Sequence, residues 1–209
     1  MTEARDLLFD DVLLAEPTQV WQSIFKSLWN TFSQPLSSPH AERDILARER
    51  SINPMELMLS GSAWELWSTF EASAQHTAAT LIEFWNAMPG GKAVLILDGL
   101  SLREAPWLLQ GAASRGYQLH RAIPCGAELP SDTNAFARAL GFGQRSALEN
   151  NGAGSAHRLP GARTESLHAA WDYCSGWFAA APNLVLWHHW PDERIHKLAE
   201  PGDGFQQLC

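Results

Sequence analysis

The sequence predicts an α/β domain with a mainly parallel sheet flanked by helices, preceded by an all-helical region. Through the first ninety residues, apolar side chains recur at helical spacing, as at Val20, Ile24 and Leu28. After Pro89-Gly90-Gly91, short apolar runs alternate with helix-like segments, which favours right-handed crossovers between parallel strands. We therefore expect a helical region over residues 1–90 and an α/β domain over residues 91–209.

In the helical region, Pro17 favours a helix that starts near Thr18, because proline suits the first turn of a helix. Residues 64–85 carry tryptophan and phenylalanine at helical spacing and predict one long helix, and Asn53-Pro54 is expected to open a shorter one. The chain has 10 tryptophans, several of them here. They form either the core of a helical bundle or an exposed face for a protein partner.

In the α/β region, we expect strands at residues 92–97, 117–123 and 183–187, and helices at residues 102–115, 133–140 and 163–180. Asp98 directly follows the first apolar run, and Asp192 and His196 follow the last one. Open α/β sheets bind ligands at the carboxyl edge that parallel strands share. We therefore expect Asp98, Thr133, Asp192 and His196 to converge there.

Composition restricts the classes of protein to which the chain can belong. Its 15 Lys and Arg against 23 Asp and Glu give a net charge of −8 without a basic block, so direct binding to nucleic acid is not expected. No apolar run reaches the roughly 18 residues of a membrane span, and the first residues do not resemble a secretion signal. The 3 cysteines are odd in number and contain no Cys-x-x-Cys pair, which indicates reduced thiols. A cytoplasmic protein is expected.

The acid and the hydroxyls have both structural and chemical interpretations. Asp98 can be a loop or cap residue, although Ser101 competes for the cap of the next helix. Ser131, Asp132 and Thr133 are all good cap residues as well. The same helix start favours a phosphate or an ionised nucleophile, because its N–H groups are unpaired and its dipole is positive.

The last segment has two interpretations as well. Asp192 and His196, four residues apart, would lie on the same side of a helical turn. There they could bind one divalent ion or form a salt-linked surface turn. His188 and His189 are close enough in sequence to supply another ligand or an outer hydrogen bond.

The order of these segments resembles the alkaline phosphatase and nucleotide pyrophosphatase/phosphodiesterase superfamily. Over residues 91–205, the chain has an apolar strand ending in Asp-Gly, a Pro-Ser-x-Thr helix start, and a strand ending in His-x-x-Pro-Asp-x-x-x-His. Leu-Asp-Gly-Leu, Leu-Pro-Ser-Asp-Thr and the preceding helical region are most similar to PglZ-type domains. Such domains occur in bacterial phage-defence systems and in signalling proteins, so the resemblance implies a bacterial, cytoplasmic setting.

The resemblance implies an alkaline-phosphatase-like core that hydrolyses a phosphate ester or nucleotide with two divalent ions, zinc or manganese. Asp98 would bind one ion, and Asp192 with His196 would bind the other. Thr133 would be the nucleophile that bridges them, with Ser131 as the alternative hydroxyl. The chain would then be a phosphatase or a phosphodiesterase.

The chain departs from the superfamily pattern at its C-terminal end. It lacks the Ser/Thr-Asp-His-Gly segment and the final metal-binding histidine that normally follow. It is then a fragment, a short form that binds metal weakly, or a degenerate domain, and His188, His189 and Asp203 are the candidate substitute ligands. Two function classes stay open: the metal-dependent hydrolase, and a catalytically incomplete PglZ-like module that scaffolds partners through its tryptophan-rich helical region.

Overall fold

The structure is a computed structural model, and it describes residues 15–37, 39–61, 63–149, 156–169, 174 and 180–198. The chain forms two compact units. The helical unit combines Met1–His76 with Ser101–Gly126, and the sheet unit combines Thr77–Leu100 with Ala127–Cys209. These limits differ from the division at residue 90 that the sequence indicates, because each unit takes in a segment from the other side of that boundary.

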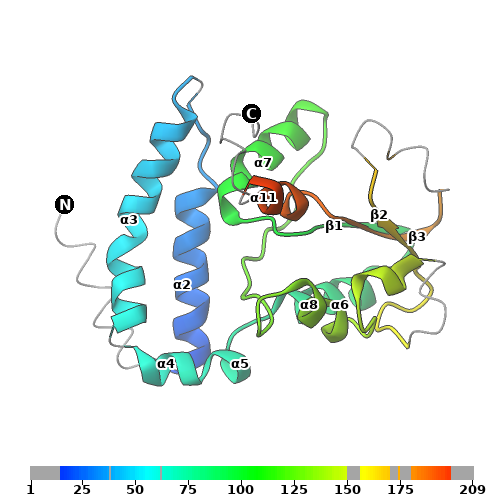
Figure 1. The fold of residues 1–209 in the computed structure, drawn as a ribbon, viewed down its shortest axis with the longest axis horizontal. Coiled ribbons are helices and arrows are strands. Elements are labelled where there is room, and N and C mark those ends of the chain that lie inside the picture. Colours follow the sequence, from blue (N-terminus) through cyan, green and yellow to red (C-terminus); the bar gives the residue numbers. More distant parts are fainter. Residues whose placement is uncertain are drawn as a thin grey trace. The chain divides into compact units, whose positions relative to one another are not determined.

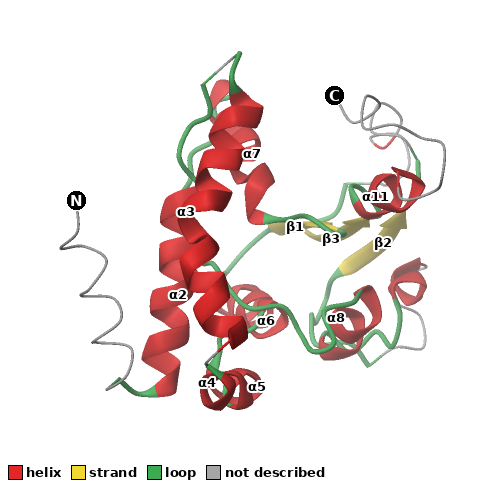
Figure 2. Cartoon of the chain, turned by 60° about the vertical axis from the view of Figure 1, so that its left-hand side comes forward, coloured by secondary structure: helices red, strands yellow, loops and turns green. Residues whose placement is uncertain are grey.

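The helical unit contains α2 (Pro17–Phe32), α3 (Ala41–Gly61), α4 (Trp64–Ser68), α5 (Phe70–Ser73), the 3-10 helix η1 (Leu102–Glu104) and α7 (Ala105–Ser114). Helices α2 and α3 lie side by side (Figures 1 and 2). The core is built mainly from the apolar stripe of α2. Trp21 meets the edge of Phe70 with ring centroids 4.8 Å apart, and its indole N–H donates to Thr69 Oγ1 at 3.2 Å.

Two helix predictions for the first ninety residues are wrong. The single helix expected over residues 64–85 is divided into α4, α5 and α6 (Thr77–Ala87), since the backbone turns extended at Ala74 with a ψ of 143°. The helix expected to open at Asn53-Pro54 does not begin there, because Pro54 lies inside α3. A proline removes one backbone N–H and kinks or breaks a helix, but good helix formers surround this one and α3 continues through it.

The tryptophans fall into both of the expected groups. Trp21 is 1% exposed and belongs to the core of the helical unit. Trp64 is 82% exposed and Trp67 is 41% exposed, so both present aromatic surface in the part of the chain that is described. Neither interpretation of the tryptophan-rich region therefore holds for all of them.

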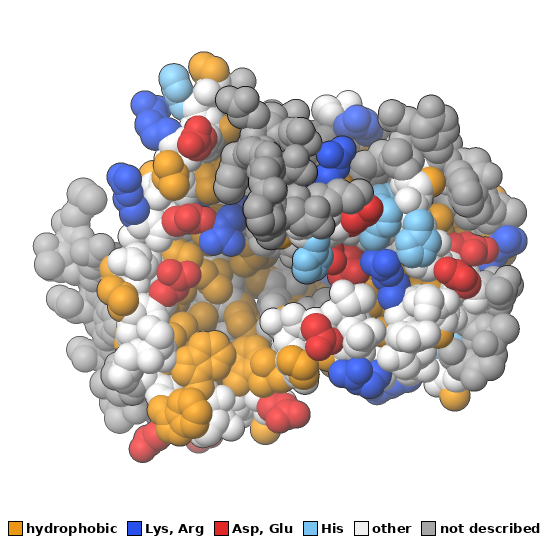
Figure 3. Space-filling view, viewed as in Figure 1, with side chains coloured by type: hydrophobic (Ala, Val, Ile, Leu, Met, Phe, Trp, Pro, Cys, Tyr) orange, Lys and Arg blue, Asp and Glu red, His pale blue; other side chains and the backbone are white. Residues whose placement is uncertain are grey.

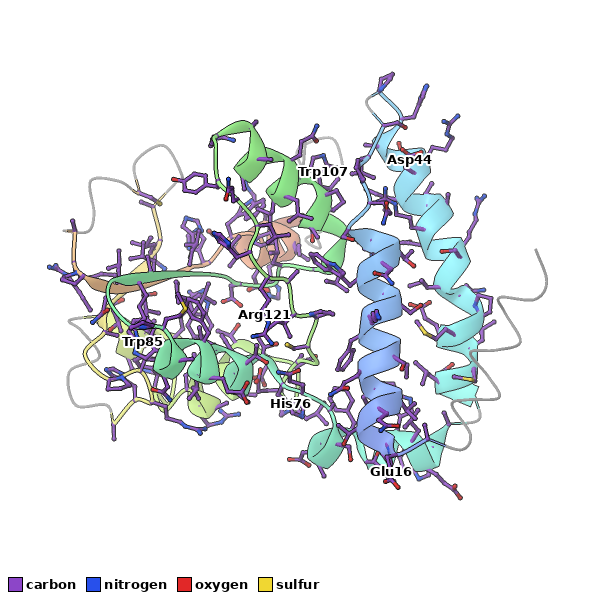
Figure 4. All side chains as sticks on the ribbon, turned by 180° about the vertical axis from the view of Figure 1, so that it is seen from behind. Glu16, Asp44, His76, Trp85, Trp107 and Arg121 are labelled. Atoms are coloured by element: carbon purple, nitrogen blue, oxygen red, sulfur yellow. The ribbon has the colours of Figure 1, made fainter. Side chains whose placement is uncertain are left out.

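The sheet unit is built on three parallel strands, β1 (Lys92–Leu97), β2 (Arg163–Leu167) and β3 (Asn183–His188), in the order β1-β3-β2. Helices α6 and α8 (Thr133–Ala139) cover one face of this sheet, and α11 (Asp192–Leu198) follows β3 (Figures 1 and 2). Trp85 of α6 belongs to the core between the helices and the sheet (Figure 4). The mixed α/β class with a parallel sheet is therefore confirmed.

Other expectations for this half of the chain have mixed outcomes. The strands at residues 92–97 and 183–187 and the helix start at Thr133 are confirmed. The strand expected at residues 117–123 is absent, and Tyr117 there is 71% exposed. The helix expected at residues 163–180 is wrong at its start, since Arg163–Leu167 is a strand in which Thr164 and Leu167 are buried. Of residues 170–179, only Cys174 is described, and it is helical.

Among the helices that the structure describes, none combines the length and the apolar character needed to cross a membrane.

Candidate functional site

The end of β1 is tied directly to the end of β3. Beyond the strand pairs, the backbone N–H of Asp98 donates to the carbonyl of His188 at 3.0 Å. The carbonyl of Asp98 accepts from the N–H of Asp192 at 2.9 Å. These two bonds bring Asp98 and the start of α11 to the same edge of the sheet, where open parallel sheets bind ligands.

Gly99 has a structural reason to follow Asp98. It has a φ of +73°, a conformation in which side chains are strained. A Cβ atom there would also come within 3.0 Å of the Cβ of Asp192. The Asp-Gly pair thus lets β1 end against α11 while Asp98 keeps its place at the edge.

The hydroxyl of Thr133 points to Asp98 because its neighbour takes the capping role. The side chain of Asp132 accepts from the N–H of Ala135 and caps α8. Thr133 Oγ1 donates to the Asp98 carboxylate, at 3.0 Å from Oδ1 and 3.2 Å from Oδ2. Of the three residues that could cap this helix, Asp132 is the cap, and Thr133 is held beside a buried acid.

Arg145 is a site residue that sequence reasoning missed. Its Nη1 lies 2.9 Å from Asp98 Oδ2, and the two side chains are 23% and 9% exposed, respectively. Arg145 begins the 3-10 helix η2 (Arg145–Leu148), which comes 47 residues after Asp98 in the chain. No spacing or motif joins the two residues, so only the fold reveals the pair.

A pocket of about 750 Å³ lies at this edge, entirely within the sheet unit. Its polar wall includes Asp98, Glu128, Ser131, Asp132, Thr133, Asp192 and His196, and its apolar wall includes Leu81, Val94, Leu95, Ile96, Phe136 and Trp187. The four residues expected to converge therefore line one pocket, together with Ser131. Their catalytic and metal-binding roles stay predictions.

Trp187 is a pocket residue to which sequence reasoning assigned no role. It is 1% exposed, and its ring meets Phe136 with centroids 5.3 Å apart. Its indole N–H has no hydrogen-bond acceptor among the described residues. Buried donors are nearly always paired, so this group would gain from an oxygen-bearing ligand in the pocket.

Asp192 and His196 lie on the same side of α11, as their spacing predicts. His196 Nε2 is 3.4 Å from Asp192 Oδ1, and the side chains are 77% and 37% exposed. This geometry fits both interpretations of the pair, a salt-linked surface turn and two ligands of one divalent ion.

His188 and His189 do not line the pocket. His188 is 1% exposed and accepts from the N–H of Trp190 through Nδ1 at 2.9 Å, so its Nε2 donates to the carbonyl of Ala169 at 2.9 Å. His189 Nε2 lies 2.6 Å from a carboxylate oxygen of Glu193. Burial lowers the pKa of His189, and Glu193 opposes this shift. Both imidazoles are thus engaged away from the predicted metal positions.

Charged side chains and histidines gather on the visible face of the sheet unit (Figure 3). Within the described ranges, no group of three or more His, Cys, Asp or Glu side chains is arranged to hold a metal ion. Asp192 and His196 fit two ligand positions of one ion, whereas Asp98 already pairs with Arg145. Asp203, the third candidate substitute ligand, lies outside the described residues.

Comparison of the chain with models of protein families, with curated proteins and with solved structures finds no match.

Proposed function

We propose that this chain is a metal-dependent phosphoric ester hydrolase domain of PglZ type, a phosphatase or phosphodiesterase with an alkaline-phosphatase-like core. One observation carries the proposal: the hydroxyl of Thr133 donates to the buried Asp98 in a pocket that Asp192 and His196 also line. A hydroxyl held by a carboxylate at a helix start, beside a carboxylate–imidazole pair, is a suitable arrangement for attack on phosphorus.

In this proposal, Thr133 is the nucleophile. Its hydrogen is directed to Asp98, which leaves an oxygen lone pair for the phosphorus atom of an ester. The new bond joins Thr133 Oγ1 to phosphorus, the bond to the leaving oxygen breaks, and water then releases the phosphoryl group from Thr133. A zinc or manganese ion bound by Asp192 and His196 would neutralise charge on the phosphoryl oxygens.

The apolar wall suits the organic part of the substrate. The same pocket that carries the carboxylates is also lined by apolar side chains, including Leu81, Phe136 and Trp187. An ester with an aromatic or base-like group, such as a nucleotide, could place that group against the apolar wall and its phosphate beside Thr133. The indole N–H of Trp187, which has no acceptor among the described residues, offers a donor to an ester oxygen.

Activity toward nitrophenyl phosphate and bis(nitrophenyl) phosphate, with added zinc or manganese, tests the proposal. Thr133→Ala should lower turnover at least about 100-fold, because it removes the attacking oxygen. Ser131→Ala, at a second hydroxyl in the same pocket, is the matched control and should lower it only a few-fold. The opposite ranking would move the nucleophile to Ser131. If both variants kept the turnover of the unsubstituted chain, a hydroxyl nucleophile would be contradicted.

A specific observation favours the second candidate, a catalytically incomplete PglZ-like module that acts as an interaction scaffold. Asp98 pairs with an arginine, and the helical unit exposes Trp64, Trp107 and Tyr117, at 82%, 46% and 71%. Exposed aromatic side chains are typical of protein interfaces. Purified protein without bound metal and without turnover in the presence of added zinc or manganese would support the scaffold.

The physiological setting follows from the PglZ resemblance. We place the protein in the bacterial cytoplasm, within a phage-defence system, where its tryptophan-rich helical unit contacts protein partners. Its acidic balance, −8 overall, disfavours direct contact with nucleic acid and with anionic membrane surfaces. Co-purification of tagged protein with partners that are lost in Trp64→Ala would support this setting, and its recovery without partners would contradict it.

A further inference from the structure

The guanidinium of Arg145 supplies the positive charge beside the buried carboxylate of Asp98. Arg145 Nη1 contacts Asp98 Oδ2 at 2.9 Å, and Thr133 Oγ1 lies within 3.2 Å of both carboxylate oxygens. Arg145 is not part of the pocket wall, whereas Asp98 and Thr133 are. The carboxylate thus has a positive partner on one side and the hydroxyl on the other.

Arg145 is held in place by buried structure. Leu148, at the other end of η2, is fully buried in the core of the sheet unit. Its carbonyl accepts from the hydroxyl of Thr164 at 2.7 Å, and Thr164 is itself fully buried in β2. The helix that carries Arg145 is therefore anchored to the sheet, and a charge-assisted bond to Asp98 does not depend on a freely moving surface side chain.

The remaining carboxylates of the pocket are largely committed. Glu128 Oε1 accepts from the N–H of Ala78 at 2.8 Å, and Asp132 caps α8. Asp192 differs, because its Oδ1 lies 3.4 Å from His196 Nε2, and the two side chains together can offer an oxygen and a nitrogen to a cation. Two divalent ions a few ångströms apart need several carboxylates to offset their repulsion, and this pocket offers one pair.

We infer that Arg145 is the resident cation of Asp98, and that the pocket accepts a single divalent ion, at Asp192 and His196. Asp98 then positions Thr133 through its hydrogen bond and is not a metal ligand. The position of the single ion rests on the proposed function, but the assignment of Arg145 can be tested without any turnover.

Titration of the full chain with Mn²⁺, followed by calorimetry and electron paramagnetic resonance, tests this inference. Asp192→Asn should weaken binding at least roughly 10-fold, as expected for loss of a ligand, while Asp98→Asn should change it less than about twofold. Arg145→Gln should gain a second site, which the double variant Asp98→Asn/Arg145→Gln should lack. Arg158→Gln is the matched control, because the Arg158 side chain donates to the backbone carbonyl of Ala139 and forms no ion pair within the described residues, so this variant should gain no site.

Thermal unfolding keeps the inference testable if Arg145→Gln folds poorly. Mn²⁺ should raise the melting temperature of Arg145→Gln by more than that of the unsubstituted chain, since the metal would replace the lost positive charge at Asp98. A folded Arg145→Gln variant that gains no site would overturn the inference. So would a roughly 10-fold loss of affinity in Asp98→Asn.

The outcomes separate this inference from the proposed function. Two ions in the unsubstituted chain, with turnover, would overturn the role of Arg145 and support the hydrolase. A second site gained in Arg145→Gln, without turnover in any variant, would support the role of Arg145 and count against the hydrolase.

Discussion

The two units differ in what they bury. The buried polar side chains among the described residues are Asp98, Thr164 and His188, and all three belong to the sheet unit. The core of the helical unit is apolar, with the ring of Trp21 close to those of Trp67 and Phe70. Burying polar groups is costly unless they are hydrogen-bonded. Asp98 and His188 lie at the carboxyl ends of β1 and β3, and Thr164 lies within β2, so the sheet unit depends on buried hydrogen bonds, while the helical unit is stabilised by aromatic packing.

The largest expected effect breaks the aromatic side of this comparison. Trp21→Ala should lower the free energy of unfolding by about 3–5 kcal/mol, because it leaves a cavity among packed rings. Trp64→Ala should change it by less than about 0.5 kcal/mol, because that side chain is 82% exposed. Urea denaturation followed by circular dichroism measures both. A cost at Trp64 as large as that at Trp21 would show that Trp64 is covered by other parts of the protein.

The next effect compares an ion pair in each unit. Arg145→Ala should cost about 2–3 kcal/mol, below the 3–5 kcal/mol of a fully buried pair, because it leaves Asp98 without its partner. Arg103→Ala removes the pair between Arg103 and Glu49 in the helical unit, where the side chains are 48% and 35% exposed. Exposed pairs contribute about 0–1 kcal/mol, so this variant should unfold nearly as the unsubstituted chain does. Equal costs would mean that Asp98 is hydrated after Arg145 is lost.

The smallest effect is a difference in how the units respond to acid. Burial lowers the pKa values of His157 and His189 in the sheet unit below the ordinary value of 6.5. Their contribution to stability is complete above pH 6.5 and is lost as the pH falls through the lowered values, because the unfolded chain binds protons first. In the helical unit, the hydroxyl and the N–H of Ser37 lower the pKa of Asp44 below 3.8. Its contribution is complete above pH 3.8 and is lost only as the pH falls through that lowered value.

Melting temperatures between pH 8 and pH 3 test this difference. The His157→Gln and His189→Gln variants should lose less stability than the unsubstituted chain between pH 7 and pH 5. Ser37→Ala should behave like the unsubstituted chain in that range and differ from it only at lower pH. A parallel pH dependence in all four proteins would contradict the assignment of these groups.

The sequence predicted best where local signals agree with the fold. The apolar runs of β1 and β3 are buried in a sheet, and their shared carboxyl edge places Asp98 near Asp192, as expected. Strand β2 was missed because Arg163-Thr-Glu-Ser-Leu is mostly polar and short, so a helical pattern extended over it. Arg145 could not be found, since the short 3-10 helix that carries it has no motif that links it to Asp98. Long-range contacts of this kind depend on how distant segments pack.

The backbone bonds between Asp98, His188 and Asp192 continue the alignment in which Leu97 pairs with His188. A slip of β3 by one residue would turn Trp187 to the opposite face and carry Asp192 away from Gly99. Correct assembly of the pocket therefore depends on correct alignment of β3. A binding titration with a ligand of this pocket would therefore measure the fraction of correctly aligned molecules in a preparation. Circular dichroism would not distinguish them from misaligned molecules with the same secondary structure.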